Sequence, residues 1–123
     1  MRTLVIGDIH GSCIALKALA EYVNFTSDDV IVTLGDYVDR GPDSKGVIDF
    51  LIELRATHKL ITLKGNHEVM MENARYTEQE LYYWLYNGGD ATVKSFNIWN
   101  PDRLAKEIPP AYWDFLDSCK RYH

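Results

Sequence analysis

Side chains that can bind metal ions and phosphate are concentrated in three short stretches of the first 70 residues. The stretches read GDIHG from Gly7, GDYVDRG from Gly35 and GNHE from Gly65. Their carboxylate, imidazole and amide donors, without thiolates, suit Mn²⁺, Fe²⁺ or Zn²⁺ better than Ca²⁺ or Cu(I). The side chains that could bind an ion or a phosphate are those of Asp8, His10, Asp36, Asp39, Arg40, Asn66, His67 and Glu68.

The regular spacing of the three stretches indicates how they are positioned. Their glycines lie about 30 residues apart, the length of one strand–helix–strand unit. Each stretch follows a short β-rich run, and apolar residues at helical spacing fill the segments between them, with Ser12 and then Asp43 or Ser44 as expected N-caps. We predict an α/β fold that begins β-α-β-α-β, with parallel strands covered on both faces. Because parallel strands end at one edge of a sheet, the polar side chains should meet there.

The second half of the chain has a different pattern. Thr77 and Glu80 form a capping-box pattern that should open a helix, and the NGG at 87–89 should end it. A further helix should begin near Pro110, since proline favours the first helical turn. No low-complexity linker separates the halves, so we expect the second half to be a helical segment packed against the α/β core.

Each candidate residue also has a purely structural interpretation. Asp8 alone would be a turn or capping residue, and Glu68 would stabilise the start of a helix. Arg40 alone would make a surface salt bridge, and His67 would be a hydrogen-bonded histidine. Carboxylates at one sheet edge repel unless neutralised, however. Arg40 could neutralise one of them and a divalent metal the rest, with Asp36 bridging two ions.

Composition limits the class of protein. A chain of 123 residues is expected to form a single domain, with an α/β core over 1–70 and mainly helix over 71–123. The net charge of −5 argues against nucleic acid as the main partner, and no apolar run is long enough for a membrane span. The isolated thiols of Cys13 and Cys119 suit a reducing cytoplasm.

In their order and spacing, the three stretches resemble the first signature blocks of the metallophosphoesterases, the calcineurin-like superfamily. An arginine follows the second aspartate of GDYVDRG, and with it the sequence resembles one branch of that superfamily in particular. This branch holds the serine/threonine protein phosphatases, their bacterial and phage relatives, and the symmetrical dinucleoside tetraphosphatases. The WLYNGGDAT stretch also resembles bacterial members of this branch. The resemblance implies one parallel half of a metallophosphoesterase sandwich, followed by a helical segment.

The resemblance assigns metal ligands by position. Asp8 and His10 would bind a first divalent ion, Asp36 would bridge two ions, and Asn66 would bind the second ion and contact the phosphate. Mn²⁺ is the expected metal, with Fe or Zn as alternatives. A hydroxide held between the ions would attack the phosphorus in line.

The resemblance also assigns the acid and the phosphate clamp. His67 would be the general acid and contact the phosphate, oriented by Asp39, while Arg40 would bind phosphate oxygens bidentately. The implied reaction is hydrolysis of phosphomonoesters, most typically by a serine/threonine-type protein phosphatase. A phosphorylated protein or a small phosphoester would then be the partner, with symmetrical dinucleoside tetraphosphate hydrolysis as the alternative.

Two further histidine motifs of the family are missing, so the sequence resembles an N-terminal portion. Only His58 and His123 remain, and neither lies in such a motif. We therefore expect a weak second metal site, little activity from residues 1–123 alone, and an uncovered apolar surface that favours self-association.

Other classes of protein fit the sequence less well. A haloacid-dehalogenase-like phosphatase would need a second aspartate where His10 stands, and the glycine spacing of a dinucleotide loop is absent. A truncated metal-binding module without catalysis remains an alternative.

Overall fold

A computed structural model describes residues 2–121. Its sheet has three parallel strands in the order β1 (Thr3–Ile6), β2 (Val30–Thr33) and β3 (Lys59–Thr62). Thr3 pairs with Val30, and Val30 pairs with Lys59, so the strands start level and end level. The predicted β-α-β-α-β arrangement is confirmed.

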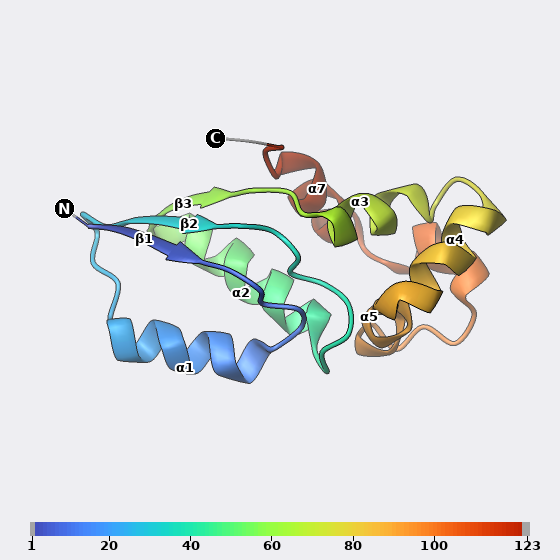
Figure 1. The fold of residues 1–123 in the computed structure, drawn as a ribbon, viewed down its shortest axis with the longest axis horizontal. Helices are drawn as coiled ribbons and strands as arrows, with labels where there is room; N and C mark the ends of the chain where they lie inside the picture. The colour runs from blue at the N-terminus through green and yellow to red at the C-terminus, as the bar shows by residue number, and fades with distance from the viewer. Residues whose placement is uncertain (1, 122–123) are drawn as a thin grey trace.

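Both crossover helices lie on the same side of this sheet (Figure 1). They are α1 (Cys13–Val23) and α2 (Ser44–Thr57). Right-handed crossovers require this arrangement when the strand order always advances in one direction. The expectation of strands covered on both faces is therefore wrong: Val5 is 60% exposed and Leu34, just after β2, is 50% exposed on the other side. Self-association through that surface stays a prediction.

The helix starts follow the predicted caps in part. Ser12 occupies the N-cap position of α1 without a side-chain capping bond. Asp43 caps α2, where its Oδ1 accepts a hydrogen bond from the Gly46 amide at 2.8 Å. Ser44, the other predicted cap, is buried and instead bonds to Thr92.

Helical elements fill the rest of the described chain beyond the carboxyl ends of the strands (Figure 1). Two predicted starts are confirmed: Thr77 caps a helix by accepting from the Glu80 amide at 3.1 Å, and Pro110 opens the last helix. The elements are α3 (Asn66–Asn73), α4 (Glu78–Trp84), the π-helical turn η1 (Leu85–Gly89), α5 (Asp90–Ser95), the 3₁₀ turn η2 (Pro101–Arg103), α6 (Leu104–Glu107) and α7 (Pro110–Ser118).

The NGG sequence interrupts the helix but does not lead into a loop. Asn87 leaves helical geometry and its Nδ2 donates to the Tyr83 carbonyl at 2.7 Å, while Gly88 has a φ of +107°. Helix α5 nevertheless starts directly at Asp90. The predicted stop is therefore a kink between two helical segments.

Buried apolar residues from both halves belong to one cluster, which includes Val47 and Leu51 of α2 and Phe115 and Leu116 of α7. The chain after α7 also reaches the sheet, where Lys120 forms a parallel bridge beside β3. Within residues 2–121, no helix combines the length and apolar character that a membrane crossing requires.

An ion pair closes the amino end of the sheet, next to the start of β2. Asp29 is only 1% exposed and accepts from Arg2 Nε at 3.0 Å and Arg2 Nη2 at 2.7 Å. The Thr26 amide donates to the same carboxylate at 2.8 Å. These bonds with Arg2 and Thr26 hold the pKa of Asp29 well below its usual range.

Candidate functional site

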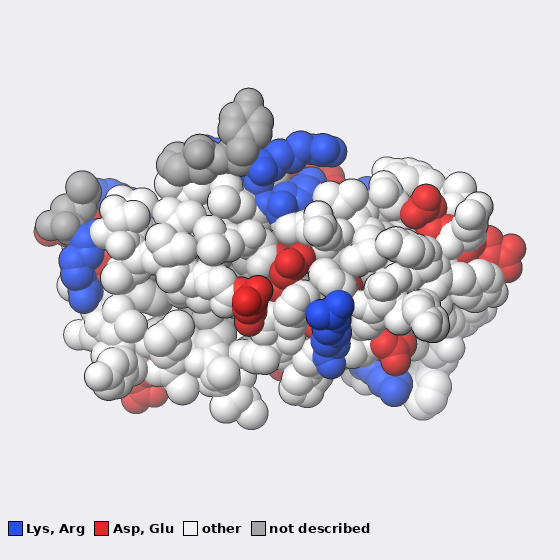
Figure 2. Space-filling model, in the orientation of Figure 1, with Lys and Arg blue, Asp and Glu red and all other residues white. Residues whose placement is uncertain are grey.

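Backbone hydrogen bonds join the first two loops where the strands end. The His10 amide donates to the Asp36 carbonyl at 2.9 Å, and the Gly11 amide to the Tyr37 carbonyl at 2.8 Å. The predicted meeting of these loops is therefore present in the backbone. In Figure 2, acidic and basic side chains lie next to each other near the middle of the visible face of the molecule, beyond the strand ends.

Glycine allows the second and third loops to touch. A Cβ on Gly35 would lie 2.4 Å from the Gly65 nitrogen, and a Cβ on Gly65 would lie 2.4 Å from the Asp36 nitrogen. Neither contact leaves space for a side chain, so glycine is a packing requirement at Gly35 and Gly65, whereas a Cβ on Gly7 would meet only Leu34 Cδ1, at 3.4 Å.

Five of the predicted site residues have left-handed backbone. The φ angles are +50° at Asp8, +37° at His10, +56° at Asp36, +77° at Asp39 and +70° at Arg40. Such angles are uncommon outside glycine and persist only where surrounding contacts impose them. The loops are thus bent into a less favourable conformation, imposed by the contacts between them.

The candidate metal ligands have suitable chemistry. Nδ1 of His10 lies 2.9 Å from the Val38 carbonyl, so Nδ1 carries the proton and Nε2 is free to ligate an ion. Asp36 and His10 are half-buried, while Asp8 and Asn66 are exposed. Oδ1 of Asp36 accepts from the His67 amide at 3.1 Å.

These donors fit a divalent ion by type but do not already enclose one. Two carboxylates, a correctly protonated imidazole and an amide match the preferences of Mn²⁺, Fe²⁺ or Zn²⁺. Across residues 2–121, however, no three His, Cys, Asp or Glu side chains are close enough together to hold an ion. The backbone brings Asp8, His10 and Asp36 together, whereas their side chains do not converge.

Asp39 and His67 form a buried pair. His67 Nδ1 lies 2.7 Å from Asp39 Oδ2, and both side chains are shielded from solvent. Because a carboxylate only accepts, Nδ1 carries a proton and Nε2 faces elsewhere. The His67 ring is 4.8 Å from the ring of His10, edge to face. The predicted orientation of His67 by Asp39 is thus present next to a candidate metal ligand.

Two residues that the sequence analysis did not single out also bind the Asp39 carboxylate. Trp84 Nε1 donates to both oxygens, at 3.0 and 2.8 Å, and the Thr92 hydroxyl donates to Oδ1 at 2.7 Å. The Asp39 amide donates to the hydroxyls of Thr92 and Ser44. Burial raises the pKa of Asp39, while the bonds from Thr92, His67 and Trp84 oppose that rise. The WLYNGGDAT stretch, which contains Trp84 and Thr92, was the available signal.

Glu68 holds the second loop in position. Its Oε1 accepts from the amides of Asp36 at 2.6 Å and Gly65 at 2.9 Å, and its Oε2 from those of Tyr37 at 2.8 Å and Val38 at 3.3 Å. The bond from the Gly65 amide fits the expectation that Glu68 stabilises the start of a helix. The three bonds from the amides of the second loop were not expected. Burial raises the pKa of Glu68, and the four backbone bonds oppose it.

Arg40 does not neutralise a carboxylate within the described part of the chain, where none lies within 4.0 Å of its guanidinium. The sequence-based suggestion of such a pair is therefore wrong. Arg40 is exposed, and its amide donates to the Gly88 carbonyl at 3.0 Å. A Cβ on Gly88 would lie 2.7 Å from Arg40 Cγ, so glycine permits this contact.

His58 lies at the C-terminus of α2, just before β3, away from these loops. Its ring nitrogens are near the Thr57 hydroxyl and the Phe25 carbonyl, as expected for a structural histidine. His123 is outside the described residues.

The chain matches the family model for calcineurin-like phosphoesterases over residues 1–117. It therefore belongs to the calcineurin-like phosphoesterase family, as the three stretches predicted.

Bacterial relatives in this family differ in their named substrates. Serine/threonine-protein phosphatase 1 of Salmonella typhimurium is 42% identical over 87 residues, which cover 70% of this chain and 38% of that protein. The symmetrical bis(5'-nucleosyl)-tetraphosphatase of Pectobacterium atrosepticum is 39% identical over 70 residues, which cover 56% of this chain and 24% of that protein. The matched segment is thus well under half the length of either relative.

Solved structures confirm the fold class. A structure provisionally described as a diadenosine tetraphosphatase matches with a TM-score of 0.63 and 25% identity, over 95% of this chain and 42% of that one. A mutant cold-active protein tyrosine phosphatase matches with a TM-score of 0.61 and 23% identity, over 95% of this chain and 37% of that one. The second likeness concerns the fold alone.

Proposed function

We propose that this chain supplies the general acid, the phosphate clamp and the first metal ligands of a phosphoesterase that hydrolyses phosphomonoesters. The observation that carries the proposal is the buried Asp39–His67 pair, in which Nδ1 is occupied and Nε2 is left for the substrate. An imidazole fixed in this way can deliver a proton to a leaving alkoxide.

The residues of this chain have separate proposed roles. Asp39 holds the His67 ring in one orientation and tautomer, and faces the positive charge of the doubly protonated ring. Arg40, exposed and without an internal ion pair in residues 2–121, is available to bind phosphate oxygens bidentately. Asn66 follows the third strand, where its amide can contact the same phosphate.

The candidate metal ligands fit by donor type. Asp8, His10 and Asp36 would hold one divalent ion, and Asp36 with Asn66 would contribute to a second; Mn²⁺ is the proposed metal. When bound, such ions make a water nucleophilic at neutral pH and neutralise charge on the phosphoryl group.

The proposed substrate is a phosphoserine or phosphothreonine protein, with a symmetrical dinucleoside tetraphosphate as the second candidate. Relatives named for each support both, and the phosphatase relative aligns with more of this chain. Cys13 and Cys119 are buried free thiols, which supports a reducing cytoplasm as the compartment.

The test compares His67→Asn with the matched control His58→Asn, which removes a histidine away from the loops. With Mn²⁺ and the full gene product, His67→Asn should lower kcat for phosphoserine by about 10²–10⁴-fold, the range of general acid catalysis. The loss should be smaller for p-nitrophenyl phosphate, whose leaving group needs less protonation. His58→Asn should leave both rates unchanged.

Equal losses for the two substrates would exclude His67 as the acid. Mn²⁺ binding without turnover of either substrate by the wild type would instead favour the non-catalytic metal-binding module.

A further inference from the structure

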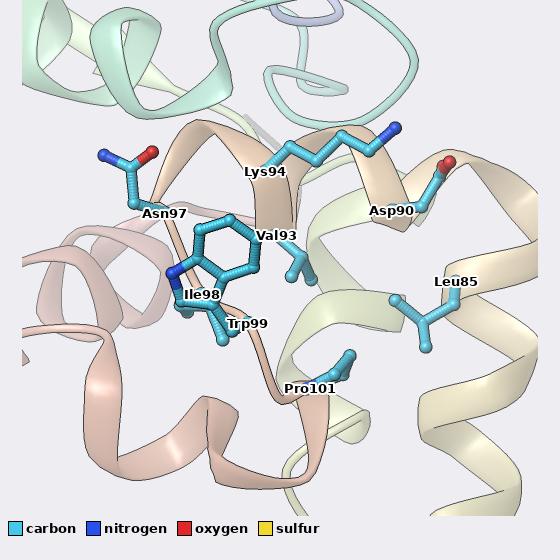
Figure 3. A pocket seen from close by; sticks show the side chains of 8 residues that line it. All are labelled: Leu85, Asp90, Val93, Lys94, Asn97, Ile98, Trp99 and Pro101. Carbon is cyan, nitrogen blue, oxygen red and sulfur yellow. The ribbon is translucent and has the colours of Figure 1, made fainter.

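A cavity of about 540 Å³ lies among η1, α5 and the segment that leads to η2. Its size is in the range of sites that bind small molecules or side chains, roughly 300–1,000 Å³. Figure 3 shows the lining side chains around this space. Its apolar walls are Leu85, Val93, Ile98, Trp99 and Pro101.

The cavity shares a helix with the acid pair. On α5, Thr92 donates to Asp39, whereas Asp90, Val93 and Lys94 line the cavity, at the spacing of one helix face. One short helix therefore borders the buried pair on one side and the cavity on the other.

The η1 turn is in contact with both the cavity and Arg40. Gly88, whose carbonyl accepts from the Arg40 amide, lies between the lining residues Leu85 and Asp90 in the sequence. The η1 turn therefore contacts Arg40 through Gly88 and contributes Leu85 to the cavity wall, so one short segment connects the two features.

Trp99, one of the lining residues, is 97% exposed. Figure 3 shows its ring among the other lining side chains, close to Val93 and Ile98 in this view. An exposed indole beside an apolar hollow offers a large contact area to an apolar ligand, and covering it with such a ligand would be favourable.

We propose that this cavity binds an apolar side chain, aromatic or large aliphatic, of a phosphopeptide whose phosphate lies at Arg40. The inference rests on the proposed phosphoesterase function and adds a binding site for a side chain that flanks the phosphorylated residue. Lys94 on the rim is exposed and, like Arg40, makes no ion pair within residues 2–121. Lys94 shares the rim with the carboxylate of Asp90, so the phosphate is assigned to Arg40 and the apolar group to the cavity walls.

The wall chemistry favours a side chain over a nucleobase. A base carries several donors and acceptors on its edges, and these would lose hydrogen bonds against Leu85, Val93, Ile98 and Pro101. Asp90, Lys94 and Asn97 supply the polar side chains of the lining, and all three are exposed to solvent, whereas Val93 and Ile98 of the wall are buried.

The experiment compares phosphoserine peptides that carry phenylalanine or alanine at each flanking position in turn. Wild-type protein with Mn²⁺ should prefer phenylalanine at one position by about tenfold in kcat/KM, from burial of part of the ring. Trp99→Ala should abolish that preference and leave turnover of p-nitrophenyl phosphate unchanged. Tyr86→Ala removes an aromatic that is 91% exposed on η1 but does not line the cavity, and should keep the preference.

Two results would overturn the inference. In the first, wild type and Trp99→Ala do not differ in peptide preference while both hydrolyse p-nitrophenyl phosphate. In the second, Trp99→Ala selectively impairs hydrolysis of diadenosine tetraphosphate, which would make the cavity a nucleobase site.

A separate binding measurement distinguishes failure of the inference from failure of the proposed function. N-acetyl-phenylalanine amide, added to ¹⁵N-labelled chain without metal, should shift the amide resonances of Val93 and Ile98 in the wild type but not in Trp99→Ala. Absence of these shifts in the wild type would overturn the cavity proposal whatever the protein's activity, whereas absence of p-nitrophenyl phosphate turnover would count against the phosphoesterase.

Discussion

Asp29 and Asp39 are both buried carboxylates, yet they lie near opposite ends of the sheet and have different partners. Asp29 pairs with the guanidinium of Arg2, which holds its pKa down. Asp39 has only an indole, a hydroxyl and a histidine, and burial raises its pKa. The amino end is thus built as an ion pair that favours folding, whereas the carboxyl end keeps a carboxylate in a less favourable environment that positions an imidazole.

The largest expected effect is on activity at Asp39. Asp39→Asn removes the acceptor that fixes His67 and faces its charge, so kcat for an alkyl phosphate should fall by about 10²–10⁴-fold. Trp84 and Thr92 can still donate to the remaining oxygen, and a buried charge is removed, so the melting temperature should stay level or rise. Steady-state kinetics and thermal unfolding measure the two effects. A large fall in melting temperature would show that Asp39 is mainly structural.

Glu68 offers the largest expected effect on stability. Both oxygens of Glu68 accept backbone N–H groups, so Glu68→Gln must place an amide N–H against such a donor. Leaving buried donors unsatisfied should lower the free energy of unfolding by about 2–3 kcal/mol, measured in urea. Glu53→Gln, at an exposed position of α2, is the control and should change it by less than about 0.5 kcal/mol. Equal effects of the two changes would contradict the assigned role of Glu68.

Asp29 should control the response of stability to acid. Because Arg2 lowers its pKa, the folded state binds fewer protons than the unfolded chain as the pH falls below about 4. The stability from this pair is therefore complete above that pH and is lost as pH falls toward the folded-state pKa. Asp29→Asn should flatten this part of the stability curve, whereas Asp28→Asn at the exposed neighbour should not. If the free energy of unfolding of Asp29→Asn fell with acid as steeply as that of the wild type, Asp29 would not be the stabilising ion pair that distinguishes it from Asp39.

The smallest expected effect on stability is at Arg40. Arg40→Ala removes an exposed side chain that has no ion pair in residues 2–121, and its backbone bond to Gly88 remains. The free energy of unfolding should change by less than about 0.5 kcal/mol, while inhibition by inorganic phosphate should weaken clearly. A fall in stability with unaltered phosphate inhibition would instead give Arg40 a structural role.

Local sequence patterns predicted the elements that depend on local chemistry. The β-α-β-α-β order, the cap at Thr77 and the helix start at Pro110 follow from periodicity and side-chain type, and all are present. The strand pattern predicted cover on both faces of the sheet and was wrong, because apolar strands do not reveal whether a second layer covers them. The uncovered apolar surface was expected only from the missing histidine motifs. The continuation into α5 also depends on tertiary contact, since Gly88 packs against Arg40.

In the site, too, residue types and spacing could be recognised in the sequence, whereas contacts between distant segments could not. Aspartate, histidine and asparagine after three strands could be recognised because their types and spacing recur. A tryptophan in a helix is usually a packing residue, and nothing local reveals that the N–H of Trp84 reaches Asp39. Glu68 was recognised as a helix-start residue, but its three bonds to the second loop depend on how the loops fold together.

The dependence of Asp39 on distant donors has a consequence for how the protein is made. Trp84 and Thr92 lie 45 and 53 residues after Asp39. During N- to C-terminal synthesis, a nascent chain that has emerged only through α3 contains all three glycine loops and His67, but not these two donors. The Asp39–His67 pair can reach its final arrangement only once α4 and α5 have emerged and docked, so assembly of the proposed proton donor is tied to a late step of biosynthesis.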